Sequence, residues 1–431
     1  MMGMAQDLYA QFTEAYRNLE LFPLYQQEEI EKFREPYGQR TLVRLKSELL
    51  ALGEAGKLIF TGHRGCGKST LLAQLAQQMR QSGLFVAGYS IADTIEPSDV
   101  NHIQILYSIA LKLMETASEK QVPIPEETQD KLLNWFSQTK SSNYTEQIKQ
   151  ELSGGINVFS FFAGKLQKES SFREIINQTY ERRVSDLSEQ IDIIAGAIQS
   201  ATKQPVLVII DDLDKLDLSV VKSIFQDNIV ALFSPRIRVV FTIPISVIRE
   251  PTLLMTLEAR SHTIMLSVTK FFTRERAHQL EATPIEKNVK RLEKILEKRI
   301  PDALIEPETK RQVVLLSGGV LREMVRLGQE CCRECMLTLE LNPDNIDVKI
   351  DKAILTLAVK SLRNQFARPL GSNSYELLVK TYREFTPPDA KSNEFLELLH
   401  GLYVLEYEND DLWFDLHPMV KDLLRRKQLI E

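Results

Sequence analysis

Cysteine, long apolar runs and excess basic charge are scarce in this chain, and each scarcity excludes a class of protein. Four cysteines among 431 residues are too few for a disulfide-stapled secreted fold. Cys332 and Cys335 have the spacing of zinc and redox motifs, but no second Cys or His pair stands at ligand spacing, so the pattern favours buried helix residues. No apolar run approaches the roughly 20 residues of a membrane-spanning helix. The net charge of −6 argues against a globally basic nucleic-acid binder and leaves a local basic patch open.

The remaining composition is that of a folded protein with a buried core. Hydrophobic residues make up 43% of the chain and charged residues 26%, which are ordinary proportions. The length predicts more than one domain. Residues 1–12 lack the basic and apolar regions of a secretory signal, so a cytoplasmic location is expected.

Residues 62–69 carry the G-x-x-x-x-G-K-[ST] pattern of a phosphate-binding loop. An apolar run at 58–60 precedes it and an amphipathic run at 71–76 follows it, which is the strand–loop–helix context that the pattern needs. Glycines let consecutive N–H groups approach phosphate oxygens, and the positive end of the next helix adds to their effect. Lys68 is expected to reach the β- and γ-phosphates, and the Ser69 hydroxyl to bind Mg²⁺. The residues predicted to bind nucleotide here are Gly62, His63, Arg64, Gly65, Cys66, Gly67, Lys68, Ser69 and Thr70.

Strands alternate with helices after this loop and predict an α/β fold. The run 206–210 has the continuous β-branched character of a central parallel strand. Such alternation predicts a parallel sheet flanked by helices, and with the phosphate loop it resembles the arrangement of P-loop NTPases. The other expected strands are 84–91, 237–243 and 262–268, and an early helix is expected at 100–120.

The segment 121–200 interrupts this alternation. A glycine-opened apolar stretch at 153–162 is expected to form a buried strand or hairpin, since it is too short to span a bilayer. Residues 171–200 are expected to form one long helix, because apolar residues recur there at helical spacing.

From residue 273 onward the pattern is helical and charged, with a hairpin near the end. Helices are expected at 285–300 and 307–340. The apolar stretches 403–407 and 412–416 flank a polar turn and predict a hairpin, which a final helix follows. Helices followed by a hairpin predict a helical lid and a small winged-helix domain.

Acidic residues come directly after the strand 206–210. Asp211 is expected to bind Mg²⁺, because a carboxylate at the C-terminal end of a central parallel strand lies at the edge where a phosphate loop opens. Asp212 is the candidate for orienting the attacking water, and Asp214 fits a helix N-cap. Thr242, at the end of a later strand, either contacts the γ-phosphate or is a β-branched strand residue.

A glycine pair opens a helix in the C-terminal half. Gly318 and Gly319 permit a tight entry, and Arg322 stands in the first turn. An arginine projecting from a neighbouring domain onto the phosphates would couple nucleotide state to domain angle. An exposed, salt-bridged arginine is the alternative, and it is the preferred interpretation for Arg326.

The order of these motifs resembles the AAA+ ATPases, most closely the branch shared by origin-recognition-type ATPases and the signal-transducing STAND ATPases. The resemblance implies binding of ATP or ADP with Mg²⁺, and hydrolysis of ATP to ADP and phosphate. Many AAA+ motors carry Asp-Glu where this chain has Asp211-Asp212. The Asp-Asp form is similar to STAND and KAP-type ATPases and favours a slow switch. The catalytic set that the resemblance implies is Lys68, Asp211, Asp212, Thr242 and Arg322.

A second resemblance concerns His417, between Leu416 and Pro418. In STAND proteins with a winged helix, a histidine in a similar place contacts the ADP β-phosphate, so His417 would bind nucleotide here. A histidine that caps the last helix or packs under the wing is the alternative. KAP-type ATPases insert membrane helices between their nucleotide motifs, whereas the segment 121–200 holds only one short apolar patch.

Three functions follow from these motifs. The first is a nucleotide-controlled switch whose partner is a second copy or a separate effector protein. The second is a DNA-binding initiator or transposition regulator, which the acidic wing tip 408–411 opposes. The third is a non-catalytic nucleotide-binding scaffold. The candidates for an arginine completing a neighbour's site are Arg236, Arg238, Arg249 and Arg260, and the basic residues that would meet DNA are Lys421, Arg425, Arg426 and Lys427.

The predicted domains are an N-terminal helical segment (1–52), a P-loop AAA+ ATPase domain (53–268) with an insertion at about 121–200, a helical lid (269–365) and a winged-helix domain (366–431).

Overall fold

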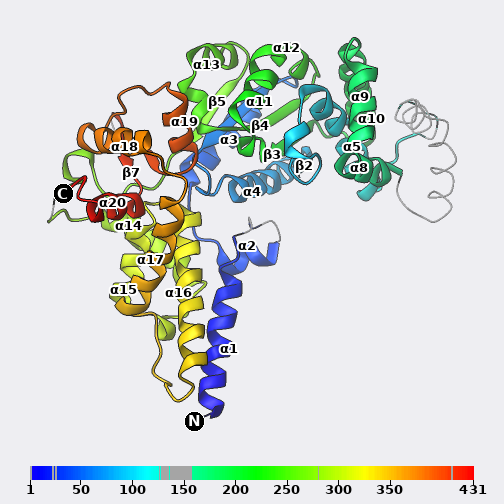
Figure 1. Ribbon diagram of the computed structural model, residues 1–431. Helices are drawn as coiled ribbons and strands as arrows, with labels where there is room; N and C mark the ends of the chain where they lie inside the picture. Colours follow the sequence, from blue (N-terminus) through cyan, green and yellow to red (C-terminus); the bar gives the residue numbers. More distant parts are fainter. Residues whose placement is uncertain are drawn as a thin grey trace. The chain divides into compact units, whose positions relative to one another are not determined.

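The structure is a computed structural model that describes residues 2–21, 24, 27–125, 127, 135, 158–279, 281–408 and 411–431. It comprises two compact units, which Figure 1 colours along the sequence. The sheet unit consists of Arg40–Thr61 and Leu71–Met265. The helical unit consists of Met1–Gln39, Gly62–Thr70 and Leu266–Glu431, so the phosphate loop belongs to it.

A five-stranded parallel sheet in the order β2-β3-β4-β1-β5 forms the centre of the sheet unit. Strand β3 lies inside the sheet between β2 and β4 and is buried along its whole length, as its continuous apolar sequence predicted. Gly88 of β2 lies opposite Ile209 of β3, and Ile209 lies opposite Val240 of β4. The predicted fold class is thereby confirmed. The strands are β1 Lys57–Gly62, β2 Phe85–Ser90, β3 Val206–Asp211, β4 Arg238–Pro244 and β5 His262–Leu266.

Helices flank this sheet and share its hydrophobic core. Tyr107, Ile109 and Leu113 of α5 are fully buried in that core. A π-helical turn joins α11 to α12. The helices are α3 Gln39–Ala51, α4 Lys68–Gln81, α5 His102–Glu119, α8 Val158–Lys168, α9 Ser170–Tyr180, α10 Val184–Thr202, α11 Leu218–Lys222, α12 Ile229–Leu232 and α13 Pro251–Glu258.

The described part of the insertion is helical, and this corrects two predictions. Residues 158–162 lie in α8 and not in a strand, because Phe159, Phe162 and Leu166 recur at helical spacing and are buried. Residues 153–157 lie outside the described residues. The single helix predicted over 171–200 is two helices, since the polar stretch 181–183 separates α9 from α10. Both helices pack on α5 (Figure 1).

The helical unit combines long helices with a C-terminal hairpin. The first helix packs along the long helix α16 (Figure 1). The predicted hairpin is present, and Val404 pairs with Leu416 in antiparallel register. We call α18, α19, the hairpin and α20 the C-terminal module. The elements are α1 Met2–Asn18, α2 Gln27–Phe33, α14 Glu286–Glu297, α15 Pro307–Leu316, α16 Leu321–Leu341, α17 Lys352–Ala367, α18 Ser372–Glu384, α19 Asn393–His400, β6 Val404–Glu408, β7 Leu412–Leu416 and α20 Pro418–Arg426.

The cysteines of α16 are packing residues. Cys331, Cys332 and Cys335 are fully buried. Burial raises the pKa of Cys332 to about 12, so its thiol stays protonated and unreactive at neutral pH. The prediction of buried helix residues is confirmed.

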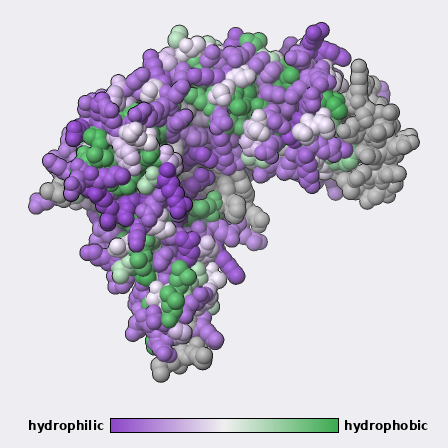
Figure 2. All heavy atoms as spheres, viewed as in Figure 1, coloured by the Kyte–Doolittle hydropathy of each residue, from purple (hydrophilic) through white to green (hydrophobic). Residues whose placement is uncertain are grey.

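On the face that Figure 2 shows, hydrophobic side chains form small, separate patches among hydrophilic ones. Among the described residues, no helix combines the length and the apolar character that crossing a membrane requires.

Substitutions of two adjacent isoleucines in α10, one buried and one exposed, test which face of the helix packs into the core. Ile194 is fully buried, whereas Ile193 is 45% exposed. Replacing Ile194 by Ala is expected to lower the free energy of unfolding by about 2–5 kcal/mol, because it leaves a cavity in the core. Replacing Ile193 by Ala is expected to cost about 0.5 kcal/mol or less. Urea denaturation of both variants measures this, and equal losses would contradict the assigned face.

Candidate functional site

The chain between β1 and α4 forms the loop that the motif predicted. β1 ends at Gly62 and α4 begins at Lys68. Gly62 has a φ of +149° and Gly65 a φ of +74°, values that favour glycine. A Cβ at Gly62 would lie 2.5 Å from the Leu266 carbonyl oxygen, and a Cβ at Gly65 would lie 2.4 Å from the Cβ of Arg322. The path of the loop therefore requires glycine at both positions.

Lys68 holds its ammonium group within the loop. The side chain is 4% exposed, and its Nζ donates hydrogen bonds to the carbonyl oxygens of Gly62 at 2.9 Å and His63 at 2.8 Å. These bonds fix a positive charge beside the turning backbone, where N–H groups bind anions. Ser69 follows in the first turn of α4, so its hydroxyl is placed where the motif expects a metal ligand. The loop is built to hold phosphate groups.

The N-terminal segment contacts the end of the loop. Cys66 is fully buried. The hydroxyl of Thr70 accepts a hydrogen bond from the Leu24 N–H at 3.4 Å. The ring of Tyr37 lies beside Gly67, where a Cβ would be 3.7 Å from its Cε1 atom. Leu24 and Tyr37 of the N-terminal segment therefore contact the loop at Thr70 and Gly67.

Two loop side chains reach the C-terminal module. His63 is 1% exposed, and its Nε2 accepts a hydrogen bond from the Glu406 N–H of β6 at 2.8 Å. Nη1 of Arg64 lies 3.3 Å from Nε2 of His400, the last residue of α19. Sequence reasoning assigned both residues to the nucleotide and missed these contacts. No local pattern could reveal them, because the partners are 343 and 336 positions away.

The beginning of α16 also contacts the loop. Gly318 and Gly319 precede α16 with φ values of +62° and +84°, and a Cβ at Gly319 would lie 1.7 Å from the Thr269 carbonyl oxygen. The Arg322 N–H donates a hydrogen bond to the Gly65 carbonyl oxygen at 3.0 Å. The predicted glycine turn and arginine therefore lie beside the loop, and it is the main chain of Arg322 that bonds to it.

His417 is fully buried where α20 begins. Its Nδ1 accepts a hydrogen bond from the Met419 N–H at 3.2 Å, and its ring stacks on Phe366 with centroids 5.0 Å apart. Burial, together with the positive charge of Arg326, lowers the pKa of His417 to about 3. The imidazole is therefore neutral at physiological pH and caps the helix, which was the alternative to an ADP contact.

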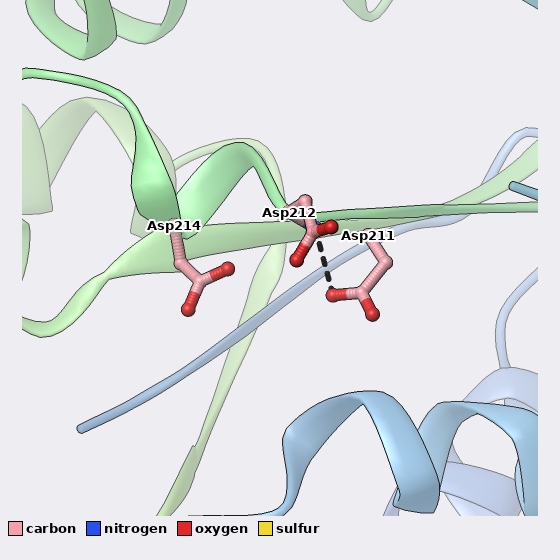
Figure 3. A group of neighbouring side chains, drawn as sticks. All are labelled: Asp211, Asp212 and Asp214. Atoms are coloured by element: carbon pink, nitrogen blue, oxygen red, sulfur yellow. Dashed lines mark hydrogen bonds between the residues drawn. The ribbon is translucent and has the colours of Figure 1, made fainter. Parts of the chain in front are cut away.

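Three buried aspartates lie together in the sheet unit where β3 ends (Figure 3). Asp211, Asp212 and Asp214 each offer a carboxylate oxygen, and these oxygens lie within 4.8 Å of one another. Oxygen ligands of this kind suit Mg²⁺. Asp214 corrects the sequence interpretation, because Asp217 holds the N-cap position of α11. The left-handed turn at Asp212, with a φ of +67°, brings Asp214 into the cluster.

Neighbouring groups fix the orientation of Asp212. Ser90 Oγ donates a hydrogen bond to Asp212 Oδ2 at 2.8 Å, and Lys215 Nζ pairs with Oδ1 at 2.7 Å. The Asp212 N–H donates a hydrogen bond to Asp211 Oδ1 at 2.8 Å, the dashed line of Figure 3. The sequence does not identify Ser90 as a site residue, because a serine at the end of a strand belongs to no recognisable motif.

Thr242 ties β4 to the turn that carries the aspartates. Its side chain is fully buried, and Oγ1 accepts a hydrogen bond from the Leu213 N–H at 3.1 Å. The same hydroxyl donates to the Ile210 carbonyl oxygen at 3.4 Å. Thr242 therefore positions the aspartate turn through the backbone on either side of it.

Comparison with known proteins agrees with the geometry of the loop. The sequence profile of the ABC transporter family matches residues 46–172, a stretch that contains the phosphate loop. No curated protein matches the chain.

Several solved structures resemble the whole chain weakly. Cdc6p from Pyrobaculum aerophilum is 11% identical with a TM-score of 0.38, over 92% of this chain and 96% of that one. Two RuvB variants from Thermotoga maritima are 12% and 13% identical with TM-scores of 0.38 and 0.35, over 94% of this chain and 95% of theirs. Likeness of this degree carries no argument about activity. The loop, the parallel sheet and the profile match together identify a P-loop nucleotide-binding fold.

Proposed function

We propose that the chain is a nucleotide-controlled switch of the AAA+/STAND type that binds ATP and hydrolyses it slowly to ADP and phosphate. One observation carries the proposal: the phosphate loop bonds directly to α16 and to the C-terminal module. Gly65 accepts the Arg322 N–H, and His63 accepts the Glu406 N–H. A change in the loop on nucleotide binding or hydrolysis therefore acts on both elements without an intermediary.

The residues of the loop bind the phosphates in this proposal. Lys68 and the N–H groups of the loop contact the β- and γ-phosphates. The buried aspartates fit Mg²⁺, and we assign Asp211 and the Ser69 hydroxyl to it. When bound, the metal ion would neutralise charge on the phosphates.

The aspartate turn supplies the group that acts on water. Asp212, held by Ser90 and Lys215, orients the attacking water with one carboxylate oxygen. Thr242 keeps the turn in place. Arg322 transmits the state of the loop to α16 through its main-chain bond to Gly65.

The C-terminal module, which we interpret as a winged helix, is the output element. Release of its bond to His63 would expose it to a second copy or to an effector protein. Arg236 and Arg260 are exposed and could serve a neighbouring copy, whereas Arg238 donates to the Leu52 carbonyl oxygen.

The basic residues of the last helix do not favour DNA binding. Lys421 pairs with Asp415 at 2.5 Å and Arg426 with Asp422 at 3.2 Å. Arg425 donates to the carbonyl oxygen of Glu431. Each would have to give up a partner inside the molecule before it contacted a phosphate backbone.

Replacing Lys68 by Ala tests the loop. The change removes charge-assisted contacts worth about 1.5–3 kcal/mol each, so ATP affinity is expected to fall about 100-fold or more. Isothermal titration measures it, with Lys168→Ala as a control on an exposed lysine. Unchanged affinity in the Lys68 variant would refute the site.

Replacing Asp212 by Asn separates binding from chemistry. The amide keeps the shape of the side chain but cannot accept a proton, so phosphate release is expected to fall about 100-fold or more while ATP affinity changes little. A phosphate-release assay beside the binding measurement checks this. Wild-type turnover in the variant would remove Asp212 from the mechanism.

Replacing His63 tests the coupling between the loop and the hairpin. His63→Ala removes the acceptor of the Glu406 N–H, so amide hydrogen exchange in β6 is expected to rise and to lose its dependence on ADP or an ATP analogue. His63→Gln offers an amide oxygen in its place and is expected to preserve the dependence. If the amide exchange rates in β6 change neither with the bound nucleotide nor with the substitution of His63, the switch proposal fails.

A further inference from the structure

A second pocket lies in the helical unit, separate from the phosphate cradle of the loop. Its cavity of ≈ 310 Å³ is lined by the loop, by α16 and α17, and by the turn before β6. Of the nine residues assigned to nucleotide in the loop, only Arg64 lines it. The loop glycines, Lys68 and Ser69 do not, so a ligand here would leave the turn around Lys68 unoccupied. It would share with the ATP phosphates only Arg64 and Arg322, which the sequence assigned to them.

The pocket carries an excess of positive charge. Arg64, Arg322 and Arg326 line it against a single carboxylate, Glu323. Arg326 Nη1 pairs with Glu323 at 3.3 Å, which confirms the salt-bridged interpretation of Arg326. Arg64 lies against His400.

Arg322 is the exception among these guanidinium groups. Within the described ranges, no hydrogen bond or ion pair involves its guanidinium group. A planar guanidinium that lacks such a partner is suited to bidentate binding of a phosphate or carboxylate.

The remaining lining combines apolar and aromatic side chains with the polar Gln365 and His400. Phe366 is 7% exposed, and its ring meets that of Tyr403 edge to face with centroids 5.4 Å apart and an interplanar angle of 88°. Leu402 is also 7% exposed. A lining that contains both aromatic rings and guanidinium groups fits a ligand with a flat apolar part and an anionic end. The cavity volume limits the ligand to a small molecule.

We propose that this pocket binds a small phosphate monoester that carries an aromatic group, and that this ligand regulates nucleotide binding at the loop. Arg322 receives the phosphate, with Arg64 beside it, and the rings of Phe366 and Tyr403 receive the apolar part. The regulation rests on the proposed function. Arg64 belongs to the loop itself, and the Arg322 N–H bonds Gly65, so occupancy of the pocket and of the loop affect each other reciprocally.

Phenyl phosphate is the probe, titrated calorimetrically into the full chain in the absence of ATP. Wild type is expected to bind it, and to bind inorganic phosphate at least tenfold more weakly, because the latter lacks the ring. Lys68→Ala is expected to bind phenyl phosphate within twofold of wild type. Arg322→Gln is expected to lose at least tenfold in affinity, and Arg322→Lys to recover only part of it. Melting curves establish that each variant is folded.

Two results would overturn the pocket. One is the absence of phenyl phosphate binding by folded wild type at millimolar concentration. The other is binding that Lys68→Ala abolishes and Arg322→Gln leaves intact, which would place the probe in the loop. Because this titration contains no ATP, its outcome is independent of the hydrolysis proposal. Regulation is tested by measuring ATP affinity with saturating phenyl phosphate, and an unchanged ATP affinity would overturn it.

Discussion

The hydrogen bond from the Arg322 N–H to the Gly65 carbonyl oxygen sets how closely α16 approaches the phosphate loop, and the rest of the helical unit depends on that distance. With the two backbones this close, no side chain fits at position 65. The turn that starts α16 is equally tight, since Gly319 lies against the Thr269 carbonyl. Tyr407 of β6 donates its hydroxyl hydrogen to the Gly318 carbonyl oxygen at 2.8 Å, which holds the hairpin to the same turn. Loop and helix are thus joined through main-chain groups, and the hairpin is held to them through the side chains of Tyr407 and His63.

The aspartate turn of the sheet unit obeys a different constraint. Asp212 adopts a left-handed conformation that costs a residue with a side chain about 1–3 kcal/mol. Its neighbours offset the cost: the Asp211 carboxylate accepts its N–H, Ser90 and Lys215 hold its side chain, and Thr242 binds the next N–H. Backbone strain that several hydrogen bonds maintain is typical of functional turns. Here the strained turn keeps the aspartate carboxylates close together, which an unstrained backbone would not do.

The sequence predicted the features that local pattern encodes. The strand at 206–210 and the loop at 62–69 could be predicted from a few consecutive residues each. Their apolar run and their glycine spacing reflect burial and backbone geometry within the segment itself. Insertion helices were harder: in α8 a short apolar run fits strand and helix equally, and only the burial of Phe159, Phe162 and Leu166 decides. His63 shows the limit most clearly. Its partner is the backbone N–H of Glu406. Because almost any residue type can supply a backbone N–H, the sequence does not reveal this contact.

The way in which the chain is divided between the two compact units also affects the order in which their contacts form during synthesis. The stretch Gly62–Thr70 is made early, yet it belongs to the compact unit that Leu266–Glu431 finishes. During synthesis the strands of the sheet emerge well before the residues that bond the loop, and such long separations slow the closing of contacts. A growing chain therefore has its sheet residues available long before its phosphate loop acquires the neighbours described above. Until the C-terminal residues are made, the phosphate loop of a nascent chain lacks its bonds to Arg322 and Glu406.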